Sequence, residues 1–390
     1  MSDEFCNFAD VMNTLYYFNP ENDLALACNS RNYFAPRHAV MLRKAGAMLP
    51  LWYCGDGDSI LADTMPDGRW FDNVCESFGL LATPVTTVGE AVSACSPWGW
   101  SPAVCQRFSS AGVSDSCLPS TEWISDLREL SHRRASVHLL TGLKRLGLYE
   151  GMIPQELVTV DTLPGLIEQS GSEGVFFKSP WSSSGRGVIP TQGMPLRSVI
   201  EQANGMIRRQ GSVMIEQSFR KVADFAMLFH KPSADGRVNF DGYSMFETGG
   251  QAYTGNILAD DAVLFNRLSQ FVDGGLILAV RDALPVLLNE YLGDSYSGYM
   301  GVDMMIVEDE HGARGLHPCV ELNLRMTMGV VAHVFTRRFL GEGLTGRLTV
   351  ARGCDCATEG YAVDGRRLVG GKLSLVAPGG EFSITVEVDR

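Results

Sequence analysis

Hydrophobic and polar residues alternate along the chain in two different periods, and this pattern divides the sequence into strands and helices. Short apolar runs between polar turns predict strands over 14–18, 49–54, 156–160, 174–178, 212–215, 224–230, 238–247, 252–258, 298–307 and 314–324. Apolar residues three or four positions apart predict helices over 36–48, 69–78, 131–146, 163–169, 195–209, 262–291 and 326–339. Ser131 should cap the helix 131–146, and Gly274-Gly275 should interrupt the helix 262–291. We also expect an antiparallel meander over 224–258 and a hairpin of 371–376 with 381–388.

The strand that leads to Arg325 carries polar side chains on one face. Glu321, Asn323 and Arg325 alternate with Leu322 and Leu324, and alternate residues of a strand point the same way. Two oxygen donors and a guanidinium are costly to bury without a partner, and oxygen donors are the ligands that Mg²⁺ prefers. An edge strand with a solvated polar face would give the same pattern. This stretch by itself leaves both interpretations open.

Asp303 is the one carboxylate inside the apolar strand 298–307. An isolated carboxylate in the interior carries a large desolvation cost. A cation shared with Glu321 would remove that cost. We therefore expect Asp303 and Glu321 to lie near a common metal ion.

The loop that follows strand 174–178 has the composition of a phosphate-binding loop. Lys178 ends the strand, and serines, glycines and Arg186 occupy positions 182–187. Glycine allows backbone N–H groups to converge on an anion, while hydroxyl groups and cations add further donors. The order GxxxxGK[ST] of a P-loop is absent, and a Ser/Gly loop is often only a flexible connection. The lysine at the strand end favours phosphate binding.

Two further polar clusters are candidates for ligand contact. His132, Arg133 and Arg134 stand at the predicted start of a helix, where cations oppose the helix dipole. An anionic partner or a solvated face would explain them. The polar turn after the first strand lies where α/β units bind ligands, although turn and cap chemistry would produce it as well. The substrate-contact candidates around this turn are Asn19, Glu21, Asn22, Asp23, Arg31 and Arg37.

Composition narrows the class of protein. The 390 residues are enough for two or three domains, and 45% hydrophobic with 20% charged residues is ordinary for a globular protein. The net charge of −13 argues against a general nucleic-acid binder, because phosphate backbones require basic surface. No apolar run is long enough to span a bilayer, and the acidic, polar first residues are unlike a secretory signal. The ten cysteines form no pair of CxxC motifs, so we expect reduced thiols in a cytoplasmic protein that binds neither membrane nor nucleic acid.

Over roughly residues 131–340, the motifs and their order resemble the ATP-grasp superfamily. The stretch 321–325 is close to the family's Glu-x-Asn-x-Arg, and Gly301-Val302-Asp303 resembles the strand that carries the first metal carboxylate. Phe177-Lys178 and the loop 182–187 resemble the nucleotide-binding lysine and the loop that covers the phosphates. Residues 216–219 resemble the hinge that holds adenine, and Asp224-Phe225 resembles the following pair, whose acid contacts ribose. Gln217 stands where an acid is frequent, and the spacing to Asp224 is longer than in the commonest form.

The resemblance implies a role for each matching residue. The implied metal ligands are Asp303, Glu321 and Asn323, and the implied catalytic residues are Lys178 and Arg325. A cationic residue on the preceding helix usually contacts the nucleotide in this family; Arg134 is our choice and Arg133 is the next candidate. The implied nucleotide contacts are Arg134, Lys178, Ser182, Ser183, Ser184, Gly185, Arg186, Gly187, Glu216, Gln217, Phe219 and Asp224.

The same resemblance implies an α/β protein, α+β in the two lobes that clamp the nucleotide. We expect a loose extension over 1–11, an N-terminal α/β pre-grasp domain over 12–130, an ATP-grasp domain over 131–340 with its hinge near 216–219, and a β-rich C-terminal appendage over 341–390. The implied activity joins a carboxylate to an amine or similar nucleophile through an acylphosphate, using ATP and Mg²⁺, with Mn²⁺ as an alternative ion. A kinase or phosphotransferase of the same fold and a non-catalytic nucleotide-binding protein are the alternatives. The expected partners are small-molecule carboxylate and amine substrates and a second copy of the chain in a homodimer.

Overall fold

The first part of the chain builds a four-stranded parallel sheet. The computed structural model describes residues 13–89, 92–169, 174–182, 187–249, 252–353 and 360–389. The strands are β1 (Thr14–Tyr17), β2 (Ser59–Leu61), β3 (Thr83–Val85) and β4 (Ala94–Pro97), in the order β3-β2-β1-β4. The chain places β2 and β3 on one side of β1 and then crosses to put β4 on the other side. The strand order therefore reverses between β1 and β4.

Helices flank this sheet. They are α1 (Asn22–Cys28), α2 (Arg37–Ala45), α3 (Gly68–Phe78), α4 (Pro102–Ala111) and α5 (Thr121–Leu130), with two 3₁₀ turns, η1 (Leu49–Trp52) and η2 (Asp115–Cys117). Ser101 caps α4 through its hydroxyl, and Pro102 follows at the first helical position, where a missing N–H costs nothing. The predicted strand over 49–54 is wrong, because this fully buried segment forms η1. A short apolar run fits either element, and Pro50 cannot donate to a sheet ladder.

A second four-stranded sheet, called the small sheet below, is antiparallel and follows α6 (Ala135–Arg145). Its strands are β5 (Gln155–Leu157), β6 (Val175–Lys178), β7 (Val188–Pro190) and β8 (Val213–Gln217), in the order β5-β8-β6-β7. Two helices pack on it, α7 (Leu163–Gln169) and α8 (Leu196–Gln210). On α8 the buried residues Val199, Ala203 and Met206 recur at helical spacing and meet Phe177 and Ile215 of the sheet.

The largest sheet has nine strands in the order β13-β12-β9-β10-β11-β14-β17-β16-β15. The predicted meander and the predicted C-terminal hairpin are both confirmed. The predicted helix 262–291 is two helices; the break lies over residues 269–273, and Gly274 and Gly275 begin the second helix and do not interrupt it. The strands are β9 (Arg220–Lys231), β10 (Asn239–Gly249), β11 (Ala252–Leu258), β12 (Gly298–Glu308), β13 (Arg314–Asn323), β14 (Gly346–Arg352), β15 (Tyr361–Asp364), β16 (Arg367–Ser374) and β17 (Phe382–Val388), and the helices are α9 (Asp261–Leu268), α10 (Gly274–Leu292) and α11 (Met328–Phe339).

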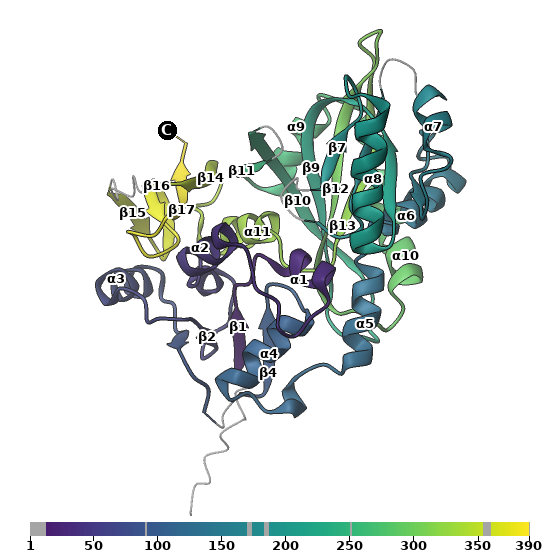
Figure 1. Cartoon of the computed structure of the whole chain (residues 1–390). Coiled ribbons are helices and arrows are strands. Elements are labelled where there is room, and N and C mark those ends of the chain that lie inside the picture. The colour runs from purple at the N-terminus through teal and green to yellow at the C-terminus, as the bar shows by residue number, and fades with distance from the viewer. Residues whose placement is uncertain are drawn as a thin grey trace, which may run out of the picture.

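Two hydrophobic cores hold the large sheet. One lies between α6, α10 and the strands β9, β12 and β13. The other joins α11 and the C-terminal strands to the N-terminal unit, where Trp52 is fully buried and its Nε1 donates to the carbonyl of Leu375 at 2.7 Å. In Figure 1 the C-terminal strands lie beside α2 and α3, which come from the other end of the chain. Over the described ranges 341–353 and 360–389, the β-rich C-terminal segment thus extends the large sheet and packs against the N-terminal unit.

The start of α6 differs from the expectation. Ser131 does not cap this helix; it follows the last residue of α5, and its hydroxyl donates to the carbonyl of Leu127 at 2.8 Å. A tight turn over 131–134 then leads into α6. Across the described ranges, no helix combines the length and the apolar character needed to cross a membrane.

Candidate active site

One face of the large sheet carries the polar residues of strand β13. The β12–β13 register places Asp303 opposite Glu321 and Gly301 opposite Asn323. Leu322 and Leu324 are buried in the core on the other side of the sheet. The predicted common face of Glu321 and Asn323 is therefore confirmed. Its physical origin is the two-residue period of the strand.

Asp303, Glu321 and Asn323 bring hard oxygen donors together. Asn323 Nδ2 donates to Asp303 Oδ2 at 3.0 Å. Burial, followed by the nearby Glu321 carboxylate, raises the pKa of Asp303 to about 7, while Arg325 opposes this shift. A divalent cation bound beside these carboxylates would favour the ionised form of Asp303. No group of three His, Cys, Asp or Glu side chains among the described residues is placed to hold a metal, so here Asn323 would have to be the third ligand.

Arg325 links this cluster to the N-terminal unit. Its Nε donates to Asp23 Oδ1 at 2.9 Å, and its Nη2 donates to Asp23 Oδ2 at 2.7 Å and to Asn323 Oδ1 at 2.9 Å. Asp23 lies in the first turn of α1, so this two-pronged ion pair crosses between units. A pair of this kind fixes the guanidinium plane beside the metal-ligand candidates.

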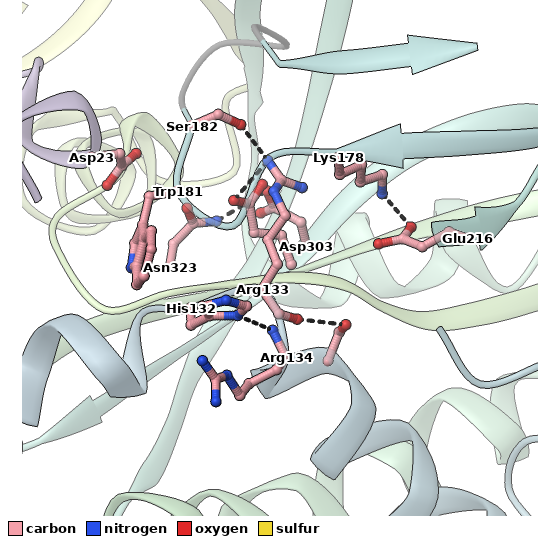
Figure 2. A network of polar contacts seen from close by, with 12 residues as sticks. Asp23, His132, Arg133, Arg134, Lys178, Trp181, Ser182, Glu216, Asp303 and Asn323 are labelled. Atoms are coloured by element: carbon pink, nitrogen blue, oxygen red, sulfur yellow. Dashed lines mark hydrogen bonds and ion pairs between the residues drawn. The ribbon is translucent and has the colours of Figure 1, made fainter. Parts of the chain in front are cut away.

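Arg133 approaches the cluster from the turn before α6. It is buried, and its Nη2 lies 3.0 Å from Glu321 Oε1 and donates to Ser182 Oγ at 2.9 Å. Its Nε is buried and has no hydrogen-bond partner among the described residues. Arg134 instead points away, about half exposed, toward Glu129 at 3.5 Å and Glu156 at 3.6 Å. The structure thus brings Arg133, our second candidate, to the site and leaves Arg134 outside it (Figure 2).

The small sheet contributes a buried ion pair. Lys178 at the end of β6 and Glu216 of β8 face each other, and Lys178 Nζ donates to Glu216 Oε2 (Figure 2). Glu216 Oε1 is buried without a partner in the described part of the chain. Only Ser218 and Phe219 separate β8 from β9 of the large sheet. The pair therefore stands next to the connection between the two sheets.

His317 faces this ion pair from β13. It is buried, its ring lies 4.8 Å from the Phe219 ring, and its Nδ1 is another buried atom with no partner in the described residues. Burial lowers its pKa to about 4, with Lys178 acting in the same direction and Glu216 opposing it. Neutral imidazole is thus the form present at neutral pH.

Strand periodicity alone places His317 on the face of Glu321, because the two residues are four positions apart. On β12, Asp303 pairs with Glu321 of β13, and Met305, two residues later, pairs with His317 of β13 and with Asp224 of β9. Between these two pairs β12 advances by two residues and β13 by four, because β13 bulges around Pro318. His317 therefore keeps the face of Glu321. Its position inside an apolar run interrupted by a proline was the available signal.

A scan against protein-family models finds no match, and no curated protein sequence matches the chain. Solved structures do match. A biotin carboxylase from Campylobacter jejuni, as a β-γ-ATP complex, has a TM-score of 0.53 at 10% identity, over 98% of this chain and 88% of that one. N5-carboxyaminoimidazole synthetase from Staphylococcus aureus has a TM-score of 0.51 at 10% identity, over 97% and 93%. The chain has the ATP-grasp fold.

A third similar structure is the biotin carboxylase domain of a Hydrogenobacter thermophilus 2-oxoglutarate carboxylase, solved with MgADP, ADP and bicarbonate. Its TM-score is 0.50 at 11% identity, over 97% of this chain and 86% of that one. The predicted resemblance is thereby confirmed for the fold.

The ends of the predicted phosphate-covering loop are anchored in this fold. Trp181 packs on the Arg128 guanidinium at 3.7 Å, and its indole N–H donates to the Arg128 carbonyl at 2.9 Å. At the other end, Gly187 has a φ of +70°, and an added Cβ would lie 2.6 Å from Ser179 Oγ, so this position requires glycine. The predicted contacts Ser183, Ser184, Gly185 and Arg186 lie outside the described residues.

The remaining predicted residues are spread over the site and its surroundings. Asp224 lies on the large sheet, where Lys221 and the Thr248 hydroxyl donate to it. Gln217 and Phe219 stand at the connection between the small sheet and the large sheet. Of the turn candidates, Asp23 reaches the site through Arg325, whereas Arg31 and Arg37 are exposed. Asp23, Arg133 and His317 are the residues whose positions sequence reasoning did not establish.

Proposed function

We propose that this protein is an ATP- and Mg²⁺-dependent ligase that joins a carboxylate to an amine or similar nucleophile. The proposal rests chiefly on one observation: Asp303, Glu321 and Asn323 share one face of the large sheet, with Arg133 and Arg325 beside them. Simple nucleotide binding does not require two carboxylates, an amide and two guanidinium groups in one cluster. Phosphoryl transfer uses groups of this kind, since its catalysis consists mainly of positioning and charge stabilisation.

The proposed reaction has two steps. The substrate carboxylate attacks the γ-phosphorus of ATP, the bond to the bridging oxygen breaks, and an acylphosphate and ADP result. The amine nitrogen then attacks the acyl carbon, expels phosphate and loses a proton, which gives the amide. Neither step needs a covalent enzyme intermediate, so none of the cysteines is assigned a role.

Each cluster has a distinct task in this proposal. Asp303, Glu321 and Asn323 would hold Mg²⁺, or Mn²⁺ in its place, which supplies charge neutralisation at the phosphates when bound. Lys178 would release Glu216 and turn to the phosphates. Arg133 and Arg325 would stabilise negative charge on the transferring group. Ser182, together with the predicted residues 183–187, would exclude water from the intermediate.

Chemical fit and fold both support this reading. The oxygen-only donor set and the raised pKa of Asp303 suit a hard divalent cation. The unpartnered atoms Glu216 Oε1 and Arg133 Nε lie where a polar ligand could satisfy them. Similar folds were solved with a β-γ-ATP complex in one case and with MgADP in another. Those ligands belong to the relatives and make ATP and Mg²⁺ the first compounds to test.

The decisive experiment is ADP release, measured with a panel of carboxylates and amines. ADP that appears only when both a carboxylate and an amine are present supports the ligase. A stable phosphorylated product with one substrate would identify a kinase or phosphotransferase instead. Nucleotide binding without turnover under any combination would leave only the non-catalytic alternative.

A matched pair of variants tests the metal cluster. Glu321→Gln keeps the shape of the side chain but removes its charge, and we expect turnover to fall by about 100-fold or more while ATP still binds measurably. Glu310→Gln is the control, because Glu310 is 83% exposed and lies in the turn before β13. Full activity of Glu321→Gln would refute the assignment.

A further inference from the structure

A second polar pocket lies in the N-terminal unit, at the point where the strand order reverses. Tyr17 ends β1, and Asn19 follows it, while Ser101 and Val104 follow β4. These residues line a cavity of about 200 Å³ between the carboxyl ends of β1 and β4. In open parallel sheets, ligands bind in this crevice at the reversal of strand order. The volume suits a single small metabolite and is too small for a nucleotide.

The pocket wall carries opposite charges. Glu21 and Arg43 form an ion pair there, with only 7% of the Glu21 side chain exposed. Burial raises the pKa of the Glu21 carboxyl, although Arg43 opposes the shift. Arg107 also lines the pocket, with its Nη2 3.2 Å from Asp63. The N-terminus of α4 adds partial positive charge beside Ser101.

The ion pair leaves hydrogen-bonding capacity unused. Glu21 Oε2 and Arg43 Nε are both buried, and neither has a partner within the described ranges. A buried pair that served packing alone would be expected to satisfy both groups, since an unsatisfied buried polar atom is costly. Here the two groups line a cavity instead. They offer an acceptor for an ammonium group and a donor for a carboxylate.

The same turn connects this pocket to the proposed reaction site. Residues 19–23 run from the pocket into α1, and Asp23 holds Arg325 at 2.7 Å. Glu21 thus lies in the pocket wall, while Asp23, two residues later, contacts Arg325 just after β13. A ligand held by Glu21 would be bound by the segment that positions Arg325.

We propose that the pocket at the ends of β1 and β4 binds a small zwitterion, with Glu21 receiving its ammonium group and Arg43 and Arg107 its carboxylate. An α-amino acid is the simplest member of this class. The pocket would then hold one of the two substrates of the ligase, a conclusion that rests on the proposed function.

Calorimetric titration of the full chain with the twenty amino acids tests the pocket directly, first without nucleotide and then with MgADP. For any amino acid that binds, its N-acetyl and amide derivatives each remove one charge. We expect each derivative to bind roughly tenfold more weakly or worse, because each loses hydrogen bonds to a charged group. Equal binding of the derivatives, or no binding of any amino acid, would overturn the proposal.

Two variants locate the binding. Glu21→Gln removes the acceptor charge, and Ala103→Trp fills the cavity from half-buried Ala103 while keeping the ion pair. Both should weaken amino-acid binding by roughly tenfold or more and leave MgADP affinity unchanged. Arg197→Ala is the control, since Arg197 is 91% exposed on α8. Unchanged amino-acid affinity in Ala103→Trp would refute the pocket even if Glu21→Gln failed to fold.

The two proposals fail in different ways. Amino-acid binding that depends on Glu21, without ADP release under any condition, would support the proposed pocket and refute the proposed ligase activity. Substrate-dependent ADP release that Ala103→Trp leaves unchanged would support the ligase activity and refute the proposed role of the pocket.

Discussion

The ion pair between Asp23 and Arg325 should couple the N-terminal unit to the segment that follows β13 by about 2 kcal/mol. The two side chains are joined by hydrogen bonds of 2.7 and 2.9 Å, and each is only 17% exposed. Hydrogen bonds to charged groups contribute about 1.5–3 kcal/mol each when buried. The residual exposure and the second partner of Arg325, Asn323, reduce what the pair alone contributes.

A double-mutant cycle measures this coupling. The variants Asp23→Ala and Arg325→Ala and the double variant are unfolded in urea, and the interaction energy is the departure from additivity. Losing either partner should destabilise the protein by more than the pair contributes, because the remaining charge is left without its partner. The readout is stability, so it does not depend on the substrate or on the proposed activity.

The exposed pair Arg197–Glu201 serves as the matched control. Its side chains are 91% and 64% exposed, and a cycle on this pair should give about 0.5 kcal/mol or less. A coupling of similar size for Asp23 and Arg325 would refute the reasoning. It would mean that solvent screens the pair despite its low exposure, and that α1 does not position the guanidinium.

Two further predictions follow from the site. Arg133→Ala should weaken the binding of a fluorescent ATP analogue by about tenfold or more, because Arg133 points into the site. Arg134→Ala should change this affinity less than about twofold, because Arg134 points away from the site. Equal effects of the two variants would contradict this geometry. His317 should make the protein lose stability as the pH falls from 6.5 toward 4, since its lowered folded-state pKa means that the unfolded chain binds the proton more tightly. Complete protonation of His317 should lower the free energy of unfolding by about 3 kcal/mol. Urea unfolding at pH 7 and pH 4.5 should therefore show a smaller loss of stability at the lower pH in His317→Gln than in the parent protein. Identical losses in the two proteins would refute this contribution of His317.

Much of the secondary structure could be predicted because its causes are local. Helix α8 follows from apolar residues at helical spacing, and the β9–β10–β11 meander follows from alternation between turns. The 3₁₀ turn η1 could not be predicted in this way. Its apolar run has no usable period, and its conformation is set by burial against α11 and the C-terminal strands.

Some features of the site could likewise be predicted from the sequence, and others could not. The sequence could not show which of Arg133 and Arg134 reaches the site, because the two residues are adjacent and identical in type. Only the turn after α5 decides which of them is buried against Glu321 and which is exposed. The even spacing of His317 and Glu321 places both on one face of the strand, but the bulge around Pro318 and the closeness of His317 to the Lys178–Glu216 pair depend on how the strands pair and pack.

The sequence by itself determined that Glu321 and Asn323 face one side of a strand and Leu322 and Leu324 the other, because the two-residue period belongs to every strand. It also contained the motif order that indicated the ATP-grasp fold. The tertiary structure alone decided which distant groups meet that face. Asp23, Arg133 and the Lys178–Glu216 pair come from three other parts of the chain, and only long-range packing brings them within bonding distance of the site or of one another.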